Sequence, residues 1–484
     1  MDDHSLKNRA SKGLFWSIGE RVATQGTLFL ISIVLARLLS PDDYGILAIL
    51  LVFVNLADVL VTDGLGSSLI QRSEIRQIDY STIFLSGAVL SLFLYVVIFL
   101  SAGYIADFYN NHNIAFYLQV LALRIPLSSF YAIQRAYVSK NLRFRDLFIA
   151  SFFGSLIAGS IAIVLAIFGW SIYALIVQQL VSIPLSSIAM FAVNRWLPGC
   201  SFSKRSFKEL FPLGMEFSGA SFINALYTNG RSLLIGKVYT PADLAFYNRG
   251  EQFPSLLVNN LNNPIANVLF PVLAEVKDDG KSFKAVAKKS LQVCVSLIFP
   301  LIFLLAVSAD DLVLLLLTEK WADCVPYLVV LCVFYLFQPL QTVNNQLLKA
   351  AGKGTLCFRL EIIKKLFCFA ALIIAIPYGV MAIALSSVIA GLISTIIGMV
   401  PNRTIVSYGL YEQFKDTLKP IACSIAASLA AISLEMVLTN AIETLVLQFV
   451  VGIAVYLVAS ILIKNEGVTY VLTEVKDRYK RFQQ

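Results

Sequence analysis

An uncharged run of 48 residues lies between Asp146 and Arg195 and reads LFIASFFGSLIAGSIAIVLAIFGWSIYALIVQQLVSIPLSSIAMFAVN. A bilayer-spanning helix needs about 20 predominantly apolar residues, because the hydrocarbon core is about 30 Å thick. The run is too long for one such helix and long enough for two, and Gly169 with Trp170 marks the break between them. Runs this long and continuous also argue against membrane strands, in which apolar and polar residues alternate.

The rest of the chain has the same character. Of its 484 residues, 58% are hydrophobic and 14% are charged, whereas soluble domains average about 45–50% and about 25%. So few charges cannot cover the surface of a soluble protein of this size. This excludes a cytosolic enzyme, a secreted disulfide scaffold and a disordered chain. The sequence therefore predicts an all-α polytopic membrane protein.

Uncharged runs along the whole chain predict about fourteen spanning helices. Their approximate ranges are 13–38, 44–70, 81–106, 114–139, 147–168, 172–194, 209–235, 244–271, 287–308, 324–348, 358–376, 380–402, 418–437 and 444–463. The basic start leads into the first range without a cleavage pattern, so we expect the first helix to be retained. Seven cysteines without a C-x-x-C pattern and two histidines predict neither a metal site nor a cofactor.

The basic residues are distributed unevenly among the loops. Of 38 lysines and arginines, 30 lie at the N-terminus, in every second loop and in the C-terminal tail, and only Arg37, Lys237 and Lys320 lie in the other loops. Lysine and arginine near span ends mark the cytoplasmic side. We therefore expect both termini in the cytoplasm. The basic loops are interpreted as topology signals and not as a nucleic-acid surface.

Two short patterns recur about 200 residues apart. Ser40-Pro41-Asp42-Asp43 matches Thr240-Pro241-Ala242-Asp243, and Gly169-Trp170 matches Gly379-Val380. The recurrence predicts two parallel six-helix repeats, at residues 1–200 and 201–410, followed by two extra helices and a basic tail at 411–484. Parallel repeats of this kind are the architecture of alternating-access transporters.

Each S/T-P-x-D pattern predicts a helix start, with Ser40 or Thr240 as the N-cap and Asp43 or Asp243 in the first turn. The alternative is a gating role for these carboxylates with Arg37 and Lys237. Both interpretations use the same residues.

Polar and ionisable residues recur at helical spacing inside six of the predicted spans, the first, second and fourth of each repeat. Because charge at membrane depth normally faces a bundle interior or a water-filled cavity, we expect a hydrated cavity there. Our candidates for substrate binding are Arg124, Arg135, Arg231, Arg249, Arg21, Asn224 and Gln341. The candidates for ion coupling or for pairing are Asp58, Glu20, Glu216 and Glu251.

Two interpretations of these charges stay open. Some of them can pair structurally, for example Glu20 with Arg231 or Asp58 with Arg124. Alternatively, the arginine fork suits an anionic or phosphate-bearing cargo, and a buried carboxylate such as Asp58 or Glu216 suits a proton or sodium ion. The chain has no ATP-binding motif, so we expect a gradient to drive any transport.

Several longer motifs resemble the Wzx-type flippases of the polysaccharide transporter family, and in particular the colanic and teichuronic acid exporter branch. The superfamily also holds MATE exporters and MurJ-type lipid II flippases. The motifs are LARLLSPDDYG (35–45), SLIQR (68–72), AFYNR (245–249), NPI (263–265), VLFP (268–271), KDD (277–279) and EKW (319–321). Glu251 departs from the family pattern and places an extra carboxylate near Arg249.

The resemblance implies a non-enzymatic transporter with MATE- and MurJ-like lobes in the bacterial cytoplasmic membrane. It would flip oligosaccharide repeat units linked to polyprenyl pyrophosphate for O-antigen, capsule or exopolysaccharide, among membrane lipids and together with a polymerase machinery. The alternatives are an ion-coupled small-molecule exporter of the MATE type, which would favour a carboxylate-rich cavity, and a membrane-embedded glycan polymerase or ligase. The latter would usually need a large outer loop, which this sequence lacks.

Overall fold

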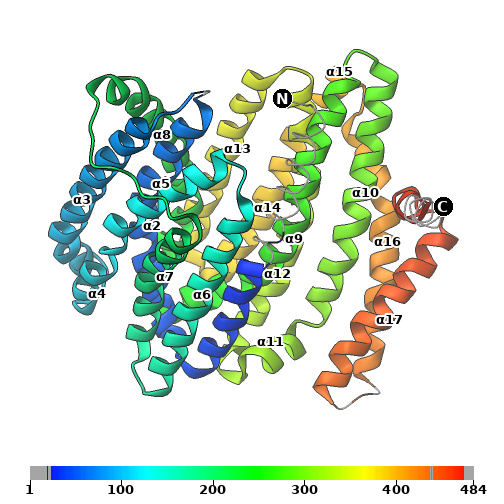
Figure 1. Cartoon of the computed structure of the whole chain (residues 1–484). Coiled ribbons are helices and arrows are strands. Elements are labelled where there is room, and N and C mark those ends of the chain that lie inside the picture. Colours follow the sequence, from blue (N-terminus) through cyan, green and yellow to red (C-terminus); the bar gives the residue numbers. More distant parts are fainter. Residues whose placement is uncertain (1–18, 20–22, 73, 437, 439, 474–484) are drawn as a thin grey trace. The chain divides into compact units, whose positions relative to one another are not determined.

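The computed structural model describes residues 19, 23–72, 74–436, 438 and 440–473, and every regular element in these ranges is a helix (Figure 1). Glu20 and Arg21 lie outside the described residues.

Ten helical segments of the described chain are long and apolar enough to cross a membrane. They are α2 (Pro41–Gln71), α3 (Gln77–Phe108), α4 with α5 (Asn113–Leu121 and Arg124–Lys140), α6 (Phe144–Ile167), α7 (Ser171–Asn194), α10 (Gly280–Val307), η1 with α12 (Glu319–Cys324 and Val325–Ala350), α14 with α15 (Val380–Met399 and Asn402–Ile405), α16 (Leu410–Glu435) and α17 (Ala441–Leu462). This confirms the all-α polytopic membrane class.

The remaining predicted spans also fall on helices. They are the helix Ala23–Leu38, α8 (Lys204–Val238), α9 (Pro241–Glu275) and α13 (Gly354–Ala375). The described part of the first is short. Helices α8 and α9 contain many uncharged polar side chains, such as Asn259, Asn260, Asn262 and Asn263, and α13 holds Arg359, Glu361, Lys364 and Lys365. The count of fourteen spans therefore stays a prediction. Between α10 and η1 lies the short α11 (Ala309–Leu317), and η2 (Ile376–Tyr378) precedes α14.

The chain packs as two compact units, of which the first ends at Ala245 and the second begins at Phe246. In the first unit α6 packs on α7, and α2 packs on α5 and α8. Helices α2 and α8 cross very closely, because a Cβ on Gly64 would lie 1.9 Å from Ser218 Oγ and 2.1 Å from the carbonyl oxygen of Gly214. Small residues at a crossing let two membrane helices approach in this way. The division into repeats at residues 200 and 410 stays a prediction.

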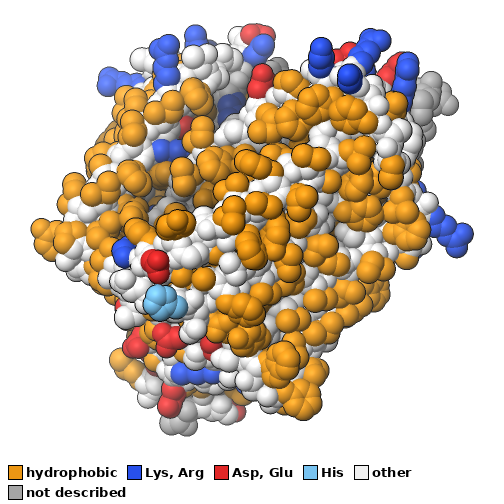
Figure 2. Space-filling view, turned by 90° about the vertical axis from the view of Figure 1, so that its left-hand side faces the viewer, with side chains coloured by type: hydrophobic (Ala, Val, Ile, Leu, Met, Phe, Trp, Pro, Cys, Tyr) orange, Lys and Arg blue, Asp and Glu red, His pale blue; other side chains and the backbone are white. Residues whose placement is uncertain are grey.

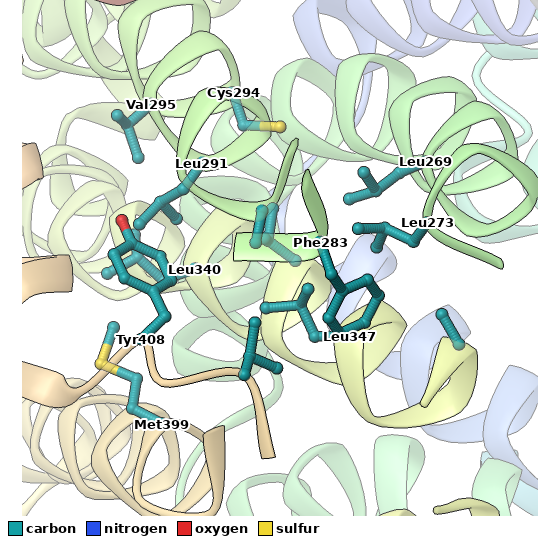
Figure 3. Close-up of a cluster of buried hydrophobic side chains, with 14 of the residues drawn as sticks. Leu269, Leu273, Phe283, Leu291, Cys294, Val295, Leu340, Leu347, Met399 and Tyr408 are labelled. Atoms are coloured by element: carbon teal, nitrogen blue, oxygen red, sulfur yellow. The ribbon is translucent and has the colours of Figure 1, made fainter. Parts of the chain in front are cut away.

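The second unit has a continuous apolar core. Leu269 and Leu273 of α9, Phe283 and Leu291 of α10, and Leu347 of α12 point toward one another (Figure 3). Tyr408 lies at the edge of this core, and its hydroxyl donates to Asp416 Oδ2 at 2.7 Å. Burial and this hydrogen bond raise the pKa of Tyr408 above its ordinary value, so the phenol stays neutral.

The surface is apolar over wide areas. On α3, Val89, Leu92, Phe93 and Leu100 are 56–71% exposed. Figure 2 shows one face of the molecule, on which hydrophobic side chains form broad patches and lysine and arginine side chains gather along the upper edge. Exposed apolar area of this extent is what contact with lipid requires.

Candidate functional site

Two adjoining hollows open between helices of the first unit. The first has a volume of about 420 Å³ and is lined by Asn55, Asp58, Val59, Thr62, Arg124, Ser128, Tyr131, Ala132, Arg135, Ile183, Ala225 and Asn229. The second has about 480 Å³ and is lined by Thr62, Asp63, Gly66, Ser67, Ile70, Ala132, Arg135, Ala136, Ser139, Phe217 and Ser221. Because Thr62, Ala132 and Arg135 line both, the two hollows form one polar site between α2, α5 and α8, with α7 beside the first.

An ion pair forms part of the wall of the first hollow. Arg124 Nε lies 3.1 Å from Asp58 Oδ2, and the two side chains are 20% and 10% exposed. Ser128 Oγ donates to Asp58 Oδ1 at 2.8 Å, and Arg124 donates from its terminal nitrogen to Gln179 Oε1 at 2.7 Å. The pair is therefore held from both sides, and the guanidinium retains N–H groups for a further acceptor.

The second hollow holds a cation in a different setting. Arg135 is exposed, and among the described residues no carboxylate forms an ion pair with it. Asp63 lines the same hollow and accepts a long hydrogen bond of 3.5 Å from Thr62 Oγ1. Within the described residues, the polar site thus contains one arginine paired with a carboxylate, Arg124, and one without such a pair, Arg135.

Helical spacing accounts for most of this site. Asp58 and Thr62 lie one turn apart on α2, and Arg124, Ser128 and Arg135 share one face of α5. The structure therefore brings together three of the residues selected from the sequence, Asp58, Arg124 and Arg135.

Other polar residues of the site are not among the candidates from the sequence, for example Gln179 and Asn229. Gln179 lies on α7, in a predicted span without acidic or basic residues, and Asn229 lies on α8. The only signal for Gln179 is the Gln178-Gln179 pair inside an apolar run.

Three other candidates lie on α8 and are not among the residues that line the two hollows. Asn224 and Glu216 are exposed, and Arg231 is half-buried.

The two S/T-P-x-D patterns form capping boxes. Asp43 Oδ2 accepts from Ser40 Oγ at 2.7 Å, and Ser171 Oγ donates to the same oxygen at 2.7 Å. Asp243 Oδ2 accepts from Thr240 Oγ1 at 2.7 Å. Each carboxylate therefore fixes the start of a long helix.

The two cations near these caps have different surroundings. Arg37 is exposed. Lys237 donates to the carbonyl oxygen of Phe108, and its Nζ lies 4.4 Å from the centre of the Phe108 ring. Lys237 thus joins the end of α8 to the end of α3.

The candidates in the second unit, Arg249, Glu251 and Gln341, form contacts with neighbouring helices. Arg249 is only 4% exposed, donates to Gln252 Oε1 at 2.7 Å, and lies 5.0 Å from the centre of the Trp321 ring. Glu251 accepts from the Tyr335 hydroxyl at 3.3 Å. Gln341 donates to Thr395 Oγ1 and to a backbone oxygen of α14. These contacts join α9, α12 and α14.

The second unit also contains a buried charge that is not among the candidates from the sequence. Lys364 of α13 is 4% exposed, and its Nζ donates to Glu361 Oε1 at 3.0 Å and to Asn345 Oδ1 at 3.3 Å. The i,i+3 spacing of Glu361 and Lys364 is the sequence signal for this pair.

The chain is similar to proteins of surface-polysaccharide synthesis. The model of a family described as polysaccharide biosynthesis protein matches residues 34–326. The lipopolysaccharide biosynthesis protein WzxC of Escherichia coli is 27% identical over 93% of this chain and 89% of that protein. The teichuronic acid biosynthesis protein TuaB of Bacillus subtilis is 24% identical over 78% and 79%.

The fold has counterparts among solved structures. The lipid II flippase MurJ in an inward closed conformation superposes with a TM-score of 0.74 at 16% identity, over 93% of this chain and 99% of that one. An inward-facing multidrug resistance MATE transporter of the MOP superfamily superposes with a TM-score of 0.63 at 16% identity, over 79% of this chain and 94% of that one. At this identity the likeness establishes the fold.

Proposed function

Because this chain belongs to the polysaccharide biosynthesis protein family, we propose that it flips lipid-linked oligosaccharides across the bacterial cytoplasmic membrane. The cargo class is an oligosaccharide repeat unit on a polyprenyl pyrophosphate, and the mechanism is alternating access. The names of WzxC and TuaB place those relatives in the synthesis of surface polysaccharides, which supports this choice. In this proposal both termini face the cytoplasm, where the lysine- and arginine-rich loops lie.

The observation that carries the proposal is the polar site of the first unit. Its hollows lie among membrane helices and hold the guanidinium groups of Arg124 and Arg135. Charge at membrane depth is costly and is kept where it serves a water-filled pathway. Guanidinium binds phosphate oxygens in a fork geometry, and the asparagine and serine side chains supply hydrogen bonds for sugar hydroxyls.

The two arginines take different roles in this proposal. Arg135 has no carboxylate partner among the described residues and meets the anionic headgroup first. Arg124 is neutralised by Asp58 at 3.1 Å when no cargo is present, because an isolated buried charge is far more costly than a paired one. A pyrophosphate then competes with Asp58 for Arg124, and the released carboxylate becomes the group that can take up a cation.

A MATE-type exporter of small molecules is the second candidate. It rests on the MATE-like fold, for which the TM-score is lower than for the flippase. A cavity for cationic drugs would carry carboxylates without arginine, whereas this site holds two of each, Asp58 and Asp63 with Arg124 and Arg135. The flippase is therefore the better fit.

The proposal is tested by complementation of a strain that lacks its own flippase. Arg124→Ala and Arg135→Ala should each lower surface polysaccharide at least tenfold, because a charge-assisted hydrogen bond contributes about 1.5–3 kcal/mol and about 1.4 kcal/mol corresponds to tenfold. Undecaprenyl-linked repeat units should accumulate in the same cells. The control is Arg205→Ala, which removes an arginine whose side chain is 87% exposed.

Membrane levels of all variants are matched by immunoblot. Wild-type polysaccharide from both Arg124→Ala and Arg135→Ala would refute the assigned role of this site. Loss of polysaccharide without accumulation of lipid-linked units would instead place the defect before the flipping step and would also contradict the proposal.

A further inference from the structure

An apolar groove in the second unit ends at a single lysine. Its volume is about 510 Å³, and it is lined by Pro264, Ile265, Val268, Leu269, Val272, Val286, Lys289, Ser290, Val293, Cys294 and Tyr470. The walls are α9 and α10, and Tyr470 comes from the helix of residues 466–473. This volume is in the range of pockets that bind small molecules, about 300–1,000 Å³.

The helix of residues 466–473 is firmly docked on α10. A Cβ on Gly467 would lie 2.4 Å from the carbonyl oxygen of Gln292, so no side chain separates the two backbones. Gln292 Nε2 donates to Glu466 Oε2 at 2.9 Å, and Ser296 Oγ donates to Asn465 Oδ1 at 3.1 Å. The aromatic end of the groove is therefore a built feature of the fold.

Lys289 differs from two neighbouring lysines on α10, Lys284 and Lys288. Lys284 pairs with Glu412 at 2.7 Å, and Lys288 pairs with Asp416 at 3.2 Å. Lys289 lines the groove, and its Nζ lies 3.4 Å from the centre of the Tyr470 ring. Among the described residues no carboxylate forms an ion pair with Lys289, so its positive charge is available to an anion.

We propose that this groove is a binding site for an anionic glycerophospholipid. One acyl chain lies between α9 and α10 against Val268 and Val293, and the headgroup phosphate lies at Lys289 Nζ beside the Tyr470 ring. Lysine and tyrosine are the side chains that anchor at the membrane interface, and basic pockets between membrane helices on the cytoplasmic side bind anionic headgroups. The lysine-rich start of α10 belongs to the side expected to face the cytoplasm.

The chemistry of the groove favours a phosphodiester over the pyrophosphate of a lipid-linked sugar. A single ammonium group matches the single charge of a phosphodiester, whereas a pyrophosphate is bound best by several cations or by the arginine fork. Apart from Lys289, Ser290 and the Tyr470 hydroxyl, the lining offers no polar side chain for a glycan. The site is independent of the proposed transport function.

Native mass spectrometry of the purified full-length protein tests the proposal. The probes are phosphatidylglycerol, phosphatidylcholine with the same acyl chains, and undecaprenyl phosphate. Wild type should bind phosphatidylglycerol about fivefold more tightly than phosphatidylcholine, which corresponds to about 1 kcal/mol for one lysine near an anionic headgroup. Lys289→Gln should abolish this preference, and Lys289→Arg should keep it.

Two further variants separate the headgroup site from the groove. Lys281→Gln, the matched control, makes the same charge change on the same helix at an exposed residue that does not line the groove, and it should keep the preference. Val268→Trp fills the groove from a side chain that is 65% exposed, so the fold is preserved while both phospholipids should bind at least threefold more weakly.

Several results would overturn the proposal. One is equal binding of the two phospholipids to wild type, and another is a preference that Lys289→Gln leaves intact. Tighter binding of undecaprenyl phosphate than of phosphatidylglycerol, lost in Lys289→Gln, would assign the groove to the cargo lipid. A protein dimer that Val268→Trp dissociates would assign it to a second copy of the chain.

Discussion

The Asp58–Arg124 ion pair can be tested by a double-mutant cycle of Asp58→Asn, Arg124→Gln and the double variant. Asp58→Asn leaves a buried guanidinium with Gln179 as its remaining partner, and Arg124→Gln leaves a carboxylate with Ser128. Breaking a buried pair from one side costs about 3–5 kcal/mol. Because the Arg124 side chain is 20% exposed to the hollow, we expect the lower end, about 3 kcal/mol for each single variant.

The double variant removes both charges together, so its loss should fall short of the sum by about 2 kcal/mol, within the range of coupling energies between contacting residues. The assay is equilibrium unfolding in mixed micelles, followed by circular dichroism. Losses that add to within about 0.5 kcal/mol would show that Asp58 and Arg124 do not interact in the folded protein. Export is measured alongside at matched membrane levels, and the double variant should fail to export polysaccharide because it lacks the guanidinium proposed to contact the cargo.

Two further predictions concern packing. Gly64→Ala should lower the free energy of unfolding by at least about 2 kcal/mol, because the added Cβ would lie 1.9 Å from Ser218 Oγ. The control is Gly103→Ala, where nothing lies within 4 Å of the added Cβ, and it should leave the free energy of unfolding unchanged or raise it. Similar losses in both variants would refute the close crossing of α2 and α8. Gln134→Met should raise the unfolding temperature measured by differential scanning fluorimetry. The Gln134 side chain is 1% exposed, both of its polar atoms lack a hydrogen-bond partner among the described residues, and a buried unsatisfied group costs about 1–3 kcal/mol. A lower unfolding temperature would show that the amide is hydrogen-bonded in solution.

The helix pattern follows closely from the distribution of charge and of helix breakers. The long uncharged run breaks as predicted, since α6 ends at Ile167 and α7 begins at Ser171. The range 114–139 was expected to be one helix, but α4 and α5 are separated at Ala122 and Leu123. The cause is Pro126, whose ring displaces the carbonyl group four residues earlier, at Ala122, and whose nitrogen cannot donate to it.

Residues of the site could be predicted from the sequence only where the spacing along one helix determines which face of that helix they lie on. Spacing along α2 and α5 places Asp58 and Arg124 on polar faces. The ion pair between these two residues, which the sequence left as one of two interpretations, is present in the structure. Gln179 could not be found in this way, because its role depends on which face of α7 meets α5. The surroundings of Arg249 depend in the same way on Trp321, a residue 72 positions later in the sequence.

The capping box at Asp43 has a mechanical consequence. Only Leu39 and Ser40 join the helix Ala23–Leu38 to α2, and two residues can reach at most about 7 Å. The same carboxylate oxygen also receives the Ser171 hydroxyl, which ties the first turn of α7 to this corner. While this hydrogen bond is kept, the three helices stay joined at this corner. A widening between α2 and α7 that preserves it is a tilt about the corner, with the displacement growing toward the far ends of the two helices.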